Sequence, residues 1–134
     1  GDDKIRGVCL DLYSQASWAE LASHLRPPLA LVNFSRFLHR GLMDFVVRRM
    51  PHGCVLAVHH FVEGAVSLKS GRSIKPHDVD KCSLRPGELA ERYAGAVEVL
   101  LDEAESSCDG GRPMCSFAGR KKPLFSLVQA FSST

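Results

Sequence analysis

Three basic side chains stand close together where an apolar run of the sequence gives way to a helical pattern. Arg36, His39 and Arg40 follow the apolar run at residues 29–34. Side chains three and four positions apart share one face of a helix, and an arginine there could bind an anionic group through two parallel hydrogen bonds. Positive charge opposes the dipole at a helix N-terminus, so a purely structural role is less favoured. The spacing predicts that these side chains bind a substrate.

Two adjacent histidines, His59 and His60, end another apolar run at residues 54–61. In open α/β sheets, ligands bind at the carboxyl ends of the strands. Side chains alternate along a strand, so the two histidines point to opposite faces and at most one reaches a shared cleft. One of them could act as a general base. The alternative is a pair of partly exposed histidines where a strand leaves the core.

The cysteines and the remaining histidines predict no metal site. The chain has five cysteines without C-x-x-C spacing; their odd number and the lack of a signal peptide predict the cytoplasm or another reducing intracellular compartment. Cys9 and Cys54 lie in apolar runs and are expected in the core. His52, His77 and Cys82 lack the spacing of zinc ligands.

The composition is that of an ordinary globular domain. The chain has 134 residues, of which 45% are hydrophobic and 24% are charged, which suits one domain. With a net charge of +2 and one compact basic run at Arg120, Lys121 and Lys122, nucleic-acid binding is not expected. No apolar stretch approaches the roughly 20 residues that a membrane-spanning helix needs.

Strand and helix patterns alternate along the first half of the chain. They predict strands at residues 5–13, 29–34 and 54–61 and helices at residues 17–25 and 37–50. Ser17 and Glu20 have the spacing of a capping box, and Pro27 and Pro28 end the first helix. The run at residues 29–34 is apolar on both faces, as in a parallel sheet covered by helices on each side.

The second half begins with a long stretch that has no periodic pattern. The patterns predict a loop at residues 62–83, a helix with Arg85 as N-cap and Glu88 at its third position, strands at residues 96–105 and 112–121, and a tail at residues 124–134. The last two strands are close enough in sequence to form an antiparallel hairpin. The fold class is therefore α/β, with parallel strands followed by a terminal antiparallel hairpin over residues 1–123.

This order of elements, with the short motifs it contains, resembles the carboxyl-terminal part of the class I S-adenosylmethionine-dependent methyltransferases. The similarity is greatest to the small tellurite-resistance-type members. It is carried by "RFLHR" (residues 36–40), "PHGCVLAV" (residues 51–58) and "LRPGEL" (residues 84–89), and it covers about residues 5–122. The resemblance implies a partial Rossmann-like sheet, S-adenosylmethionine as cofactor and a small-molecule or unknown methyl acceptor.

The resemblance also implies which residues serve the cofactor. A carboxylate at Asp11 would accept from the adenine amine, and Leu12 would pack on the ring, whereas the residues that end the central strand would lie near the reactive methyl group. The matching cofactor-binding positions are Asp11, Leu12, Asn33, Phe34 and Ser35. The alternatives are a turn at Asp11 and a helix cap at Asn33 or Ser35. Methyl transfer depends mainly on positioning, and His59 or His60 would be the base.

The resemblance is incomplete at the cofactor site. The glycine-rich G-x-G-x-G turn of the family is absent, and the only double glycine is Gly110-Gly111. The family's strand order is 3-2-1-4-5-7-6, and this chain begins to match at the third strand. Without strands 1 and 2, residues 5–13 would be separated from the sheet and residues 29–34 would form an open edge. We therefore expect a methyltransferase-like fragment that cannot bind the cofactor fully alone.

Two other functions remain compatible with the sequence. A non-catalytic descendant could use the open sheet edge to dimerise or to bind a partner. A nucleic-acid-associated domain could use the basic run at residues 120–122 together with Lys4 and Arg6, in which case its binding would weaken steeply with salt.

Overall fold

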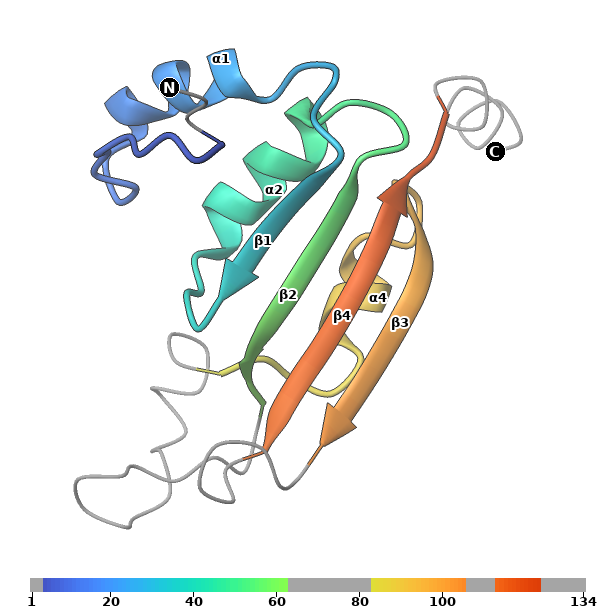
Figure 1. Ribbon diagram of the computed structural model, residues 1–134. Helices are drawn as coiled ribbons and strands as arrows, with labels where there is room; N and C mark the ends of the chain where they lie inside the picture. The colour runs from blue at the N-terminus through green and yellow to red at the C-terminus, as the bar shows by residue number, and fades with distance from the viewer. Residues whose placement is uncertain (1–3, 63–82, 106–112, 124–134) are drawn as a thin grey trace, which may run out of the picture.

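A mixed β-sheet organises the chain in this computed structural model, which describes residues 4–62, 83–105 and 113–123 (Figure 1). Its strands are β1 (Leu31–Ser35), β2 (Val55–Phe61), β3 (Val97–Glu105) and β4 (Met114–Lys121). The order across the sheet is β1-β2-β4-β3. The β1 and β2 strands are parallel, whereas β4 is antiparallel to both of its neighbours. The predicted α/β class, with parallel strands followed by an antiparallel pair, is confirmed.

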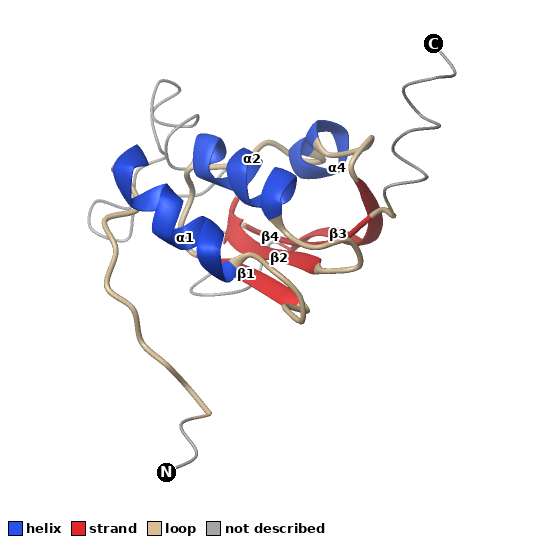
Figure 2. Cartoon of the chain, turned by 90° about the horizontal axis from the view of Figure 1, so that it is seen from above, coloured by secondary structure: helices blue, strands red, loops and turns tan. Residues whose placement is uncertain are grey.

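The described α-helices all lie on one face of this sheet (Figure 2). They are α1 (Trp18–His24), which follows the short 3₁₀ turn η1 (Gln15–Ser17), α2 (Arg40–Arg49) and α4 (Glu88–Arg92). The prediction of a strand covered on both sides is wrong, because no described element covers the second face and Leu31 is 54% exposed there. The described part of the chain is therefore a two-layer structure.

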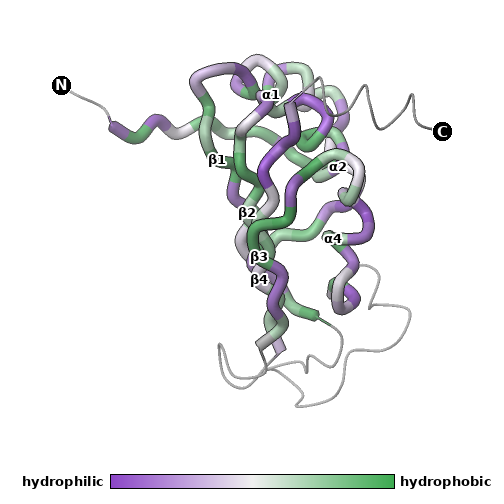
Figure 3. Tube along the Cα trace, turned by 90° about the vertical axis from the view of Figure 1, so that its right-hand side faces the viewer, coloured by the Kyte–Doolittle hydropathy of each residue, from purple (hydrophilic) through white to green (hydrophobic). Residues whose placement is uncertain are grey.

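The core lies between the sheet and α2. Helix positions 42, 43, 46 and 47 are buried, which is the spacing of one apolar face. They meet strand side chains that point to the same side. Figure 3 shows green, hydrophobic stretches along the strands, which alternate with white and purple ones. The largest fully buried side chains are Phe117, Leu42, Met43, Met50 and Leu56. The prediction of an amphipathic helix at residues 37–50 is confirmed except for its first turn.

The predicted strand at residues 5–13 is not formed. Its first residues are extended but pair with no described strand, and Ile5 is 89% exposed. The prediction that Cys9 lies in the core is therefore wrong, because Cys9 is exposed, whereas Cys54 is buried as predicted. An apolar run forms a strand only where a neighbouring strand completes its backbone hydrogen bonds. No described strand lies beside residues 5–13 to do so.

Two helix starts differ from the predictions. Ser17 has helical dihedral angles and its side chain makes no capping hydrogen bond, so the predicted capping box of α1 is wrong. The last helix starts at Glu88 because Gly87 adopts a left-handed conformation with φ of 74°, which glycine tolerates best. The Glu88 carboxylate nevertheless accepts the Arg85 backbone N–H at 3.1 Å, which is the contact that the glutamate of a capping box makes.

Several predicted features lie outside the described residues. These are the interior of the loop at residues 62–83, with His77 and Cys82, the turn at residues 106–112 and the tail at residues 124–134. The two ends of the loop are joined, because the Leu84 N–H donates to the Phe61 carbonyl at 2.9 Å.

Among the described helices, none has the length and apolar character required to cross a membrane.

The basic run at residues 120–122 is divided between the surface and the core. The Lys121 side chain is buried, and its Nζ donates to the carbonyls of Arg48 at 2.7 Å and Met50 at 2.9 Å. It thereby satisfies carbonyl groups at the end of α2, where a positive charge is favourable. Arg120, in contrast, is exposed and lies 4.0 Å from Glu98. The run is therefore no continuous basic surface.

Lys121→Ala is expected to lower the free energy of unfolding by about 2 kcal/mol, because hydrogen bonds that involve a charged group contribute about 1.5–3 kcal/mol. The matched control is Lys122→Ala, since Lys122 donates to the Ala94 carbonyl at an exposed site and is expected to contribute less than about 1 kcal/mol. Urea unfolding of both variants measures the difference. Equal losses would contradict the role of Lys121 at the end of α2.

Candidate functional site

A cavity of about 400 Å³ lies along the outer edge and carboxyl end of β1, between this strand and helices α1 and α2. This volume is within the range of small-molecule pockets. Most of the lining is apolar. The lining residues are Leu12, Leu21, Leu25, Val32, Asn33, Phe34, Ser35, Phe37, Leu42 and Val46.

The cavity brings together four of the five residues predicted to bind the cofactor. Leu12, Asn33, Phe34 and Ser35 all line it, although Leu12 is more than twenty positions away from the others. The fifth residue, Asp11, does not line it; its Oδ1 accepts the Tyr13 backbone N–H at 3.1 Å. Asp11 thus forms the local turn that was the alternative interpretation of its sequence position.

Aromatic side chains surround this region. Phe37 lies 5.7 Å from Tyr13 and 6.3 Å from Phe34, measured between ring centroids. The Trp18 indole donates to the Leu12 carbonyl at 3.0 Å and thereby holds Leu12 beside the helix. Aromatic rings of this kind provide apolar faces against which a planar ligand can stack.

His39 begins helix α2 instead of facing this cavity. Its backbone is extended, and its Nδ1 accepts the Leu42 N–H at 3.0 Å, which is the hydrogen bond that an N-cap side chain makes. The expectation that Arg36, His39 and Arg40 share a helix face is therefore wrong. The helix starts at Arg40, and Arg36 precedes it with a left-handed φ of 55°.

His39→Ala is expected to destabilise the protein by about 1 kcal/mol, the usual effect of removing an N-cap. His39→Asn should recover most of this loss, because asparagine is a strong N-cap residue. Thermal or urea unfolding of the two variants compares them directly. If Asn were no better than Ala at this position, capping would not be the role of His39.

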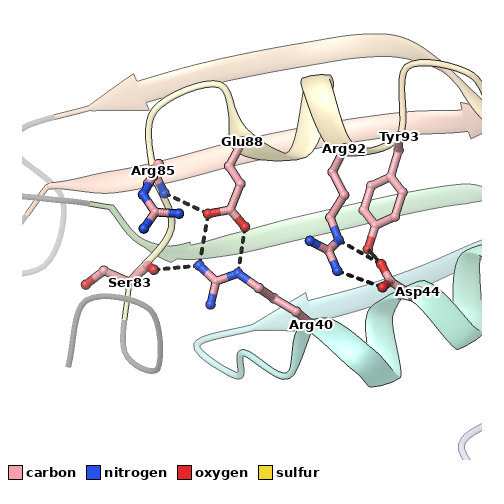
Figure 4. Close-up of polar contacts among 7 residues, drawn as sticks. All are labelled: Arg40, Asp44, Ser83, Arg85, Glu88, Arg92 and Tyr93. Carbon is pink, nitrogen blue, oxygen red and sulfur yellow. Dashed lines mark hydrogen bonds and ion pairs between the residues drawn. The ribbon is translucent and has the colours of Figure 1, made fainter. Parts of the chain in front are cut away.

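Arg40 is held by an ion pair that joins α2 to α4 (Figure 4). Its Nε donates to Glu88 Oε2 at 2.7 Å, and its Nη2 donates to Glu88 Oε1 at 2.9 Å and to the Ser83 carbonyl at 3.0 Å. The hydrogen bond from Arg40 holds the pKa of Glu88 below its ordinary value, against the opposing effect of burial. The predicted substrate ligand Arg40 therefore already has a carboxylate partner within the chain.

A second ion pair lies next to the first (Figure 4). Arg92 donates to Asp44 through Nε at 2.8 Å and through Nη2 at 2.7 Å, and the Tyr93 hydroxyl donates to Asp44 at 2.7 Å. The hydrogen bond from Arg92 lowers the pKa of Asp44, and burial raises the pKa of Tyr93. The sequence analysis missed this cluster, because its partners are 48 and 49 positions apart and no local pattern links them.

The arginines line a different cavity from the predicted cofactor residues. This second cavity has a volume of about 340 Å³ and is lined by Arg40, Arg85, Glu88 and Arg92. The structure thus separates the predicted substrate ligand Arg40 from Asn33, Phe34 and Ser35, although these residues are close in sequence.

The two histidines of β2 point to opposite faces of the sheet, as predicted. His59 lies on the uncovered face, where it pairs with Ser35 in β1 and Ser116 in β4. His60 is buried on the helix side and pairs with Cys115. Neither histidine is among the described residues that line the 400 Å³ cavity. Burial raises the pKa of Cys115 to about 11, so this thiol stays protonated near neutral pH.

No protein-family model matches the chain, and a search of curated proteins found no match. The function of the chain is therefore inferred from its own residues.

Proposed function

We propose that this chain forms one wall of an S-adenosylmethionine site in a class I methyltransferase-like domain, and that segments outside these 134 residues supply the opposite wall. The observation that carries the proposal is the cavity at the carboxyl end of β1. Four of the five positions that the resemblance assigns to the cofactor line it, namely Leu12, Asn33, Phe34 and Ser35. Ligands of open α/β sheets bind at this end of the strands.

The sheet order supports the same assignment. In the order 3-2-1-4-5-7-6, the strands numbered 4, 5, 7 and 6 follow one another, with an antiparallel pair at the end. The observed order is β1-β2-β4-β3, with the same parallel and antiparallel pairings. An uncovered sheet face and an open edge at β1 are also expected if half of a doubly wound domain is missing, since such sheets carry helices on both faces.

The residues present fit part of the cofactor. Leu12 and Phe34 offer apolar surface to the adenine ring, and Asn33 and Ser35 are polar groups at the end of the strand. However, no carboxylate is among the described lining residues, so none of them provides the acidic side chain that holds the ribose hydroxyls in dinucleotide-binding sites of open α/β sheets. The sequence also has no G-x-G-x-G turn. When bound, the cofactor would supply the methyl group, and this wall would position it.

Photo-crosslinking with S-adenosylmethionine that carries a labelled methyl group tests the proposal. At millimolar cofactor, we expect the label in peptides that contain residues 29–37 or Leu12. Val32→Phe fills the cavity and should reduce labelling, whereas the matched Val55→Phe, on the uncovered face of β2, should not. Labelling spread evenly over the chain, or confined to the cavity of Arg40 and Arg92, would contradict the proposal.

A second candidate is a non-catalytic interaction module, and it is favoured by the unpaired outer edge of β1. This strand ends the sheet, and open edges readily take another strand. If the chain self-associated through this edge and showed no specific crosslink to the cofactor, the second candidate would replace the first.

A further inference from the structure

The outer edge of β1 presents backbone groups that pair with no described strand. The Ala30 carbonyl accepts the Val55 N–H, and the Arg36 N–H donates to the His59 carbonyl. Because alternate residues of a strand direct their backbone groups to the same side, Val32 and Phe34 also bond to β2. The N–H and C=O groups of Leu31, Asn33 and Ser35 consequently face the open side.

An apolar cavity runs along the same edge on the helix side of the sheet. Its lining includes Val32 and Phe34 from β1, Leu21 from α1, and Leu42 and Val46 from α2. A strand added to an edge gains affinity from main-chain hydrogen bonds and specificity from pockets for its alternate side chains. The edge and the cavity together therefore form an acceptor for a short strand with apolar alternate residues.

The chain also carries a segment with the properties of such a strand. Residues 5–10, here called the N-terminal arm, have the sequence IRGVCL and pair with no described strand. Ile5 is 89% exposed and Val8 is 46% exposed, which is unusual for β-branched apolar residues. The arm is about as long as β1, and Val8 and Leu10 lie two positions apart, so both can point into the cavity.

The arm is directed away from the edge of its own chain. Figures 2 and 3 both show it extending from the body of the molecule. The residues that follow it are held in place: Asp11 accepts the N–H of Tyr13 through its side chain and the N–H of Ser14 through its carbonyl, both at 3.1 Å. With this turn intact, the arm is directed away from the edge of its own chain and is exposed to another molecule.

The opposite edge of the sheet is a poorer acceptor. In β3, the pairing with β4 is irregular between Val99 and Leu101. A bulge of this kind twists an edge strand and interrupts the regular row of backbone groups that a further strand needs. The edge of β1 has no such irregularity over Leu31–Ser35.

We propose that two copies of this chain exchange their N-terminal arms, each arm adding as a strand to the β1 edge of the other copy and placing Val8 and Leu10 in its cavity. Because each copy gives one arm and receives one, the contact closes as a two-fold dimer. The proposal goes beyond the proposed function and does not depend on it, since it uses only the edge, the apolar lining and the arm. An exchanged arm would occupy the edge and the cavity that the proposed function assigns to the missing segments and the cofactor. The exchange is therefore proposed for this chain of 134 residues, and S-adenosylmethionine should compete with it.

Two proline variants test the exchange by sedimentation velocity over a concentration series. Val8→Pro breaks the arm at an exposed, unpaired position, and Leu31→Pro removes an N–H that faces the open edge, so the β1–β2 hydrogen bonds remain. The wild type should shift to the mass of a dimer as concentration rises, and each variant should weaken dimerisation by at least about tenfold. Leu100→Lys, on the β3 edge, is the control and should dimerise normally.

Mixing the two variants makes the test specific. Val8→Pro keeps an intact edge and Leu31→Pro keeps an intact arm, so an equimolar mixture should form a heterodimer that neither variant forms alone. A wild type that stays monomeric at all concentrations would overturn the proposal. Dimerisation of Val8→Pro by itself would also overturn it, because direct pairing of two β1 edges or of two β3 edges would then explain the dimer.

Discussion

Arg40→Ala is expected to lower the free energy of unfolding by about 3 kcal/mol, the lower end of the range for breaking a buried ion pair. The reason is the carboxylate that remains. Glu88 is bound through both oxygens by Arg40, and the two side chains are only 13% and 21% exposed respectively. Removing Arg40 leaves Glu88 largely buried without its main partner and also releases the Ser83 carbonyl. Urea unfolding measures the loss.

Arg48→Ala is the matched control for Arg40→Ala, because Arg48 is an exposed arginine on the same helix and should change stability by less than about 0.5 kcal/mol. The double variant Arg40→Met/Glu88→Leu should be much more stable than the sum of its single changes, since an apolar pair of similar size can replace a buried ion pair. A loss in Arg40→Ala no larger than in Arg48→Ala would contradict the structural role of this pair.

The same ion pair predicts an acid-dependent loss of stability. Arg40 holds the pKa of Glu88 in the folded protein below its ordinary value of 4.5. The stabilisation that this ion pair gives is therefore complete above pH 4.5. It is lost as the pH falls through the lower pKa that Glu88 has in the folded protein. Arg40→Ala should reduce the slope of stability against pH in this acid range. The Asp44–Arg92 pair is present in both proteins, so its own pH dependence is the same in both. If the two proteins showed the same dependence of stability on pH, Arg40 would not be the cause of the lowered Glu88 pKa.

Leu42→Ala is expected to lower the free energy of unfolding by about 2–5 kcal/mol, the range for removing a buried leucine side chain. Leu42 is 1% exposed and belongs to the buried core. The matched control is Leu31→Ala, because Leu31 is 54% exposed on the uncovered face of β1 and should contribute less than about 1 kcal/mol. Chemical unfolding of both variants tests whether the structure has one covered face. Similar losses would mean that the second face is also packed.

The strands and the longest helix were predictable from sequence because their signals are local. The apolar face of α2 follows the helical period, and β2 begins as an apolar run after the turn at residues 51–53. The β3–β4 pair was predictable from its short connection. Each of these elements finds its partner close by in sequence or is long enough to be recognised alone.

The errors arose where a distant or missing partner decides the structure. Residues 5–10 have the composition of a strand but no neighbour in the described chain, so they remain extended and exposed. The predicted helix face shared by Arg36, His39 and Arg40 is not formed for a different, local reason: α2 begins at Arg40, and His39 is its N-cap. The pairing of Arg40 with Glu88 joins residues 48 positions apart, and its bidentate geometry depends on how α4 packs against α2.

The candidate site was predicted in part for the same reason. Asn33, Phe34 and Ser35 are consecutive at the end of β1, so their common position follows from the strand alone. Leu12 joins them only because α1 and the Trp18 hydrogen bond bring the first turn back to β1. Asp11 and the two histidines of β2 do not line the cavity.

The central claim is that the carboxyl end of β1 is one wall of a cofactor site, and a residue-resolved NMR titration of the ¹⁵N-labelled chain with S-adenosylmethionine tests it most directly. We predict shift changes centred on Leu12, Asn33, Phe34 and Ser35, with a dissociation constant in the millimolar range because the opposite wall is absent. Changes centred on Arg40 and Arg92, or no localised change at saturating cofactor, would contradict the claim. Saturation at micromolar cofactor would show that these residues form a complete site instead of one wall.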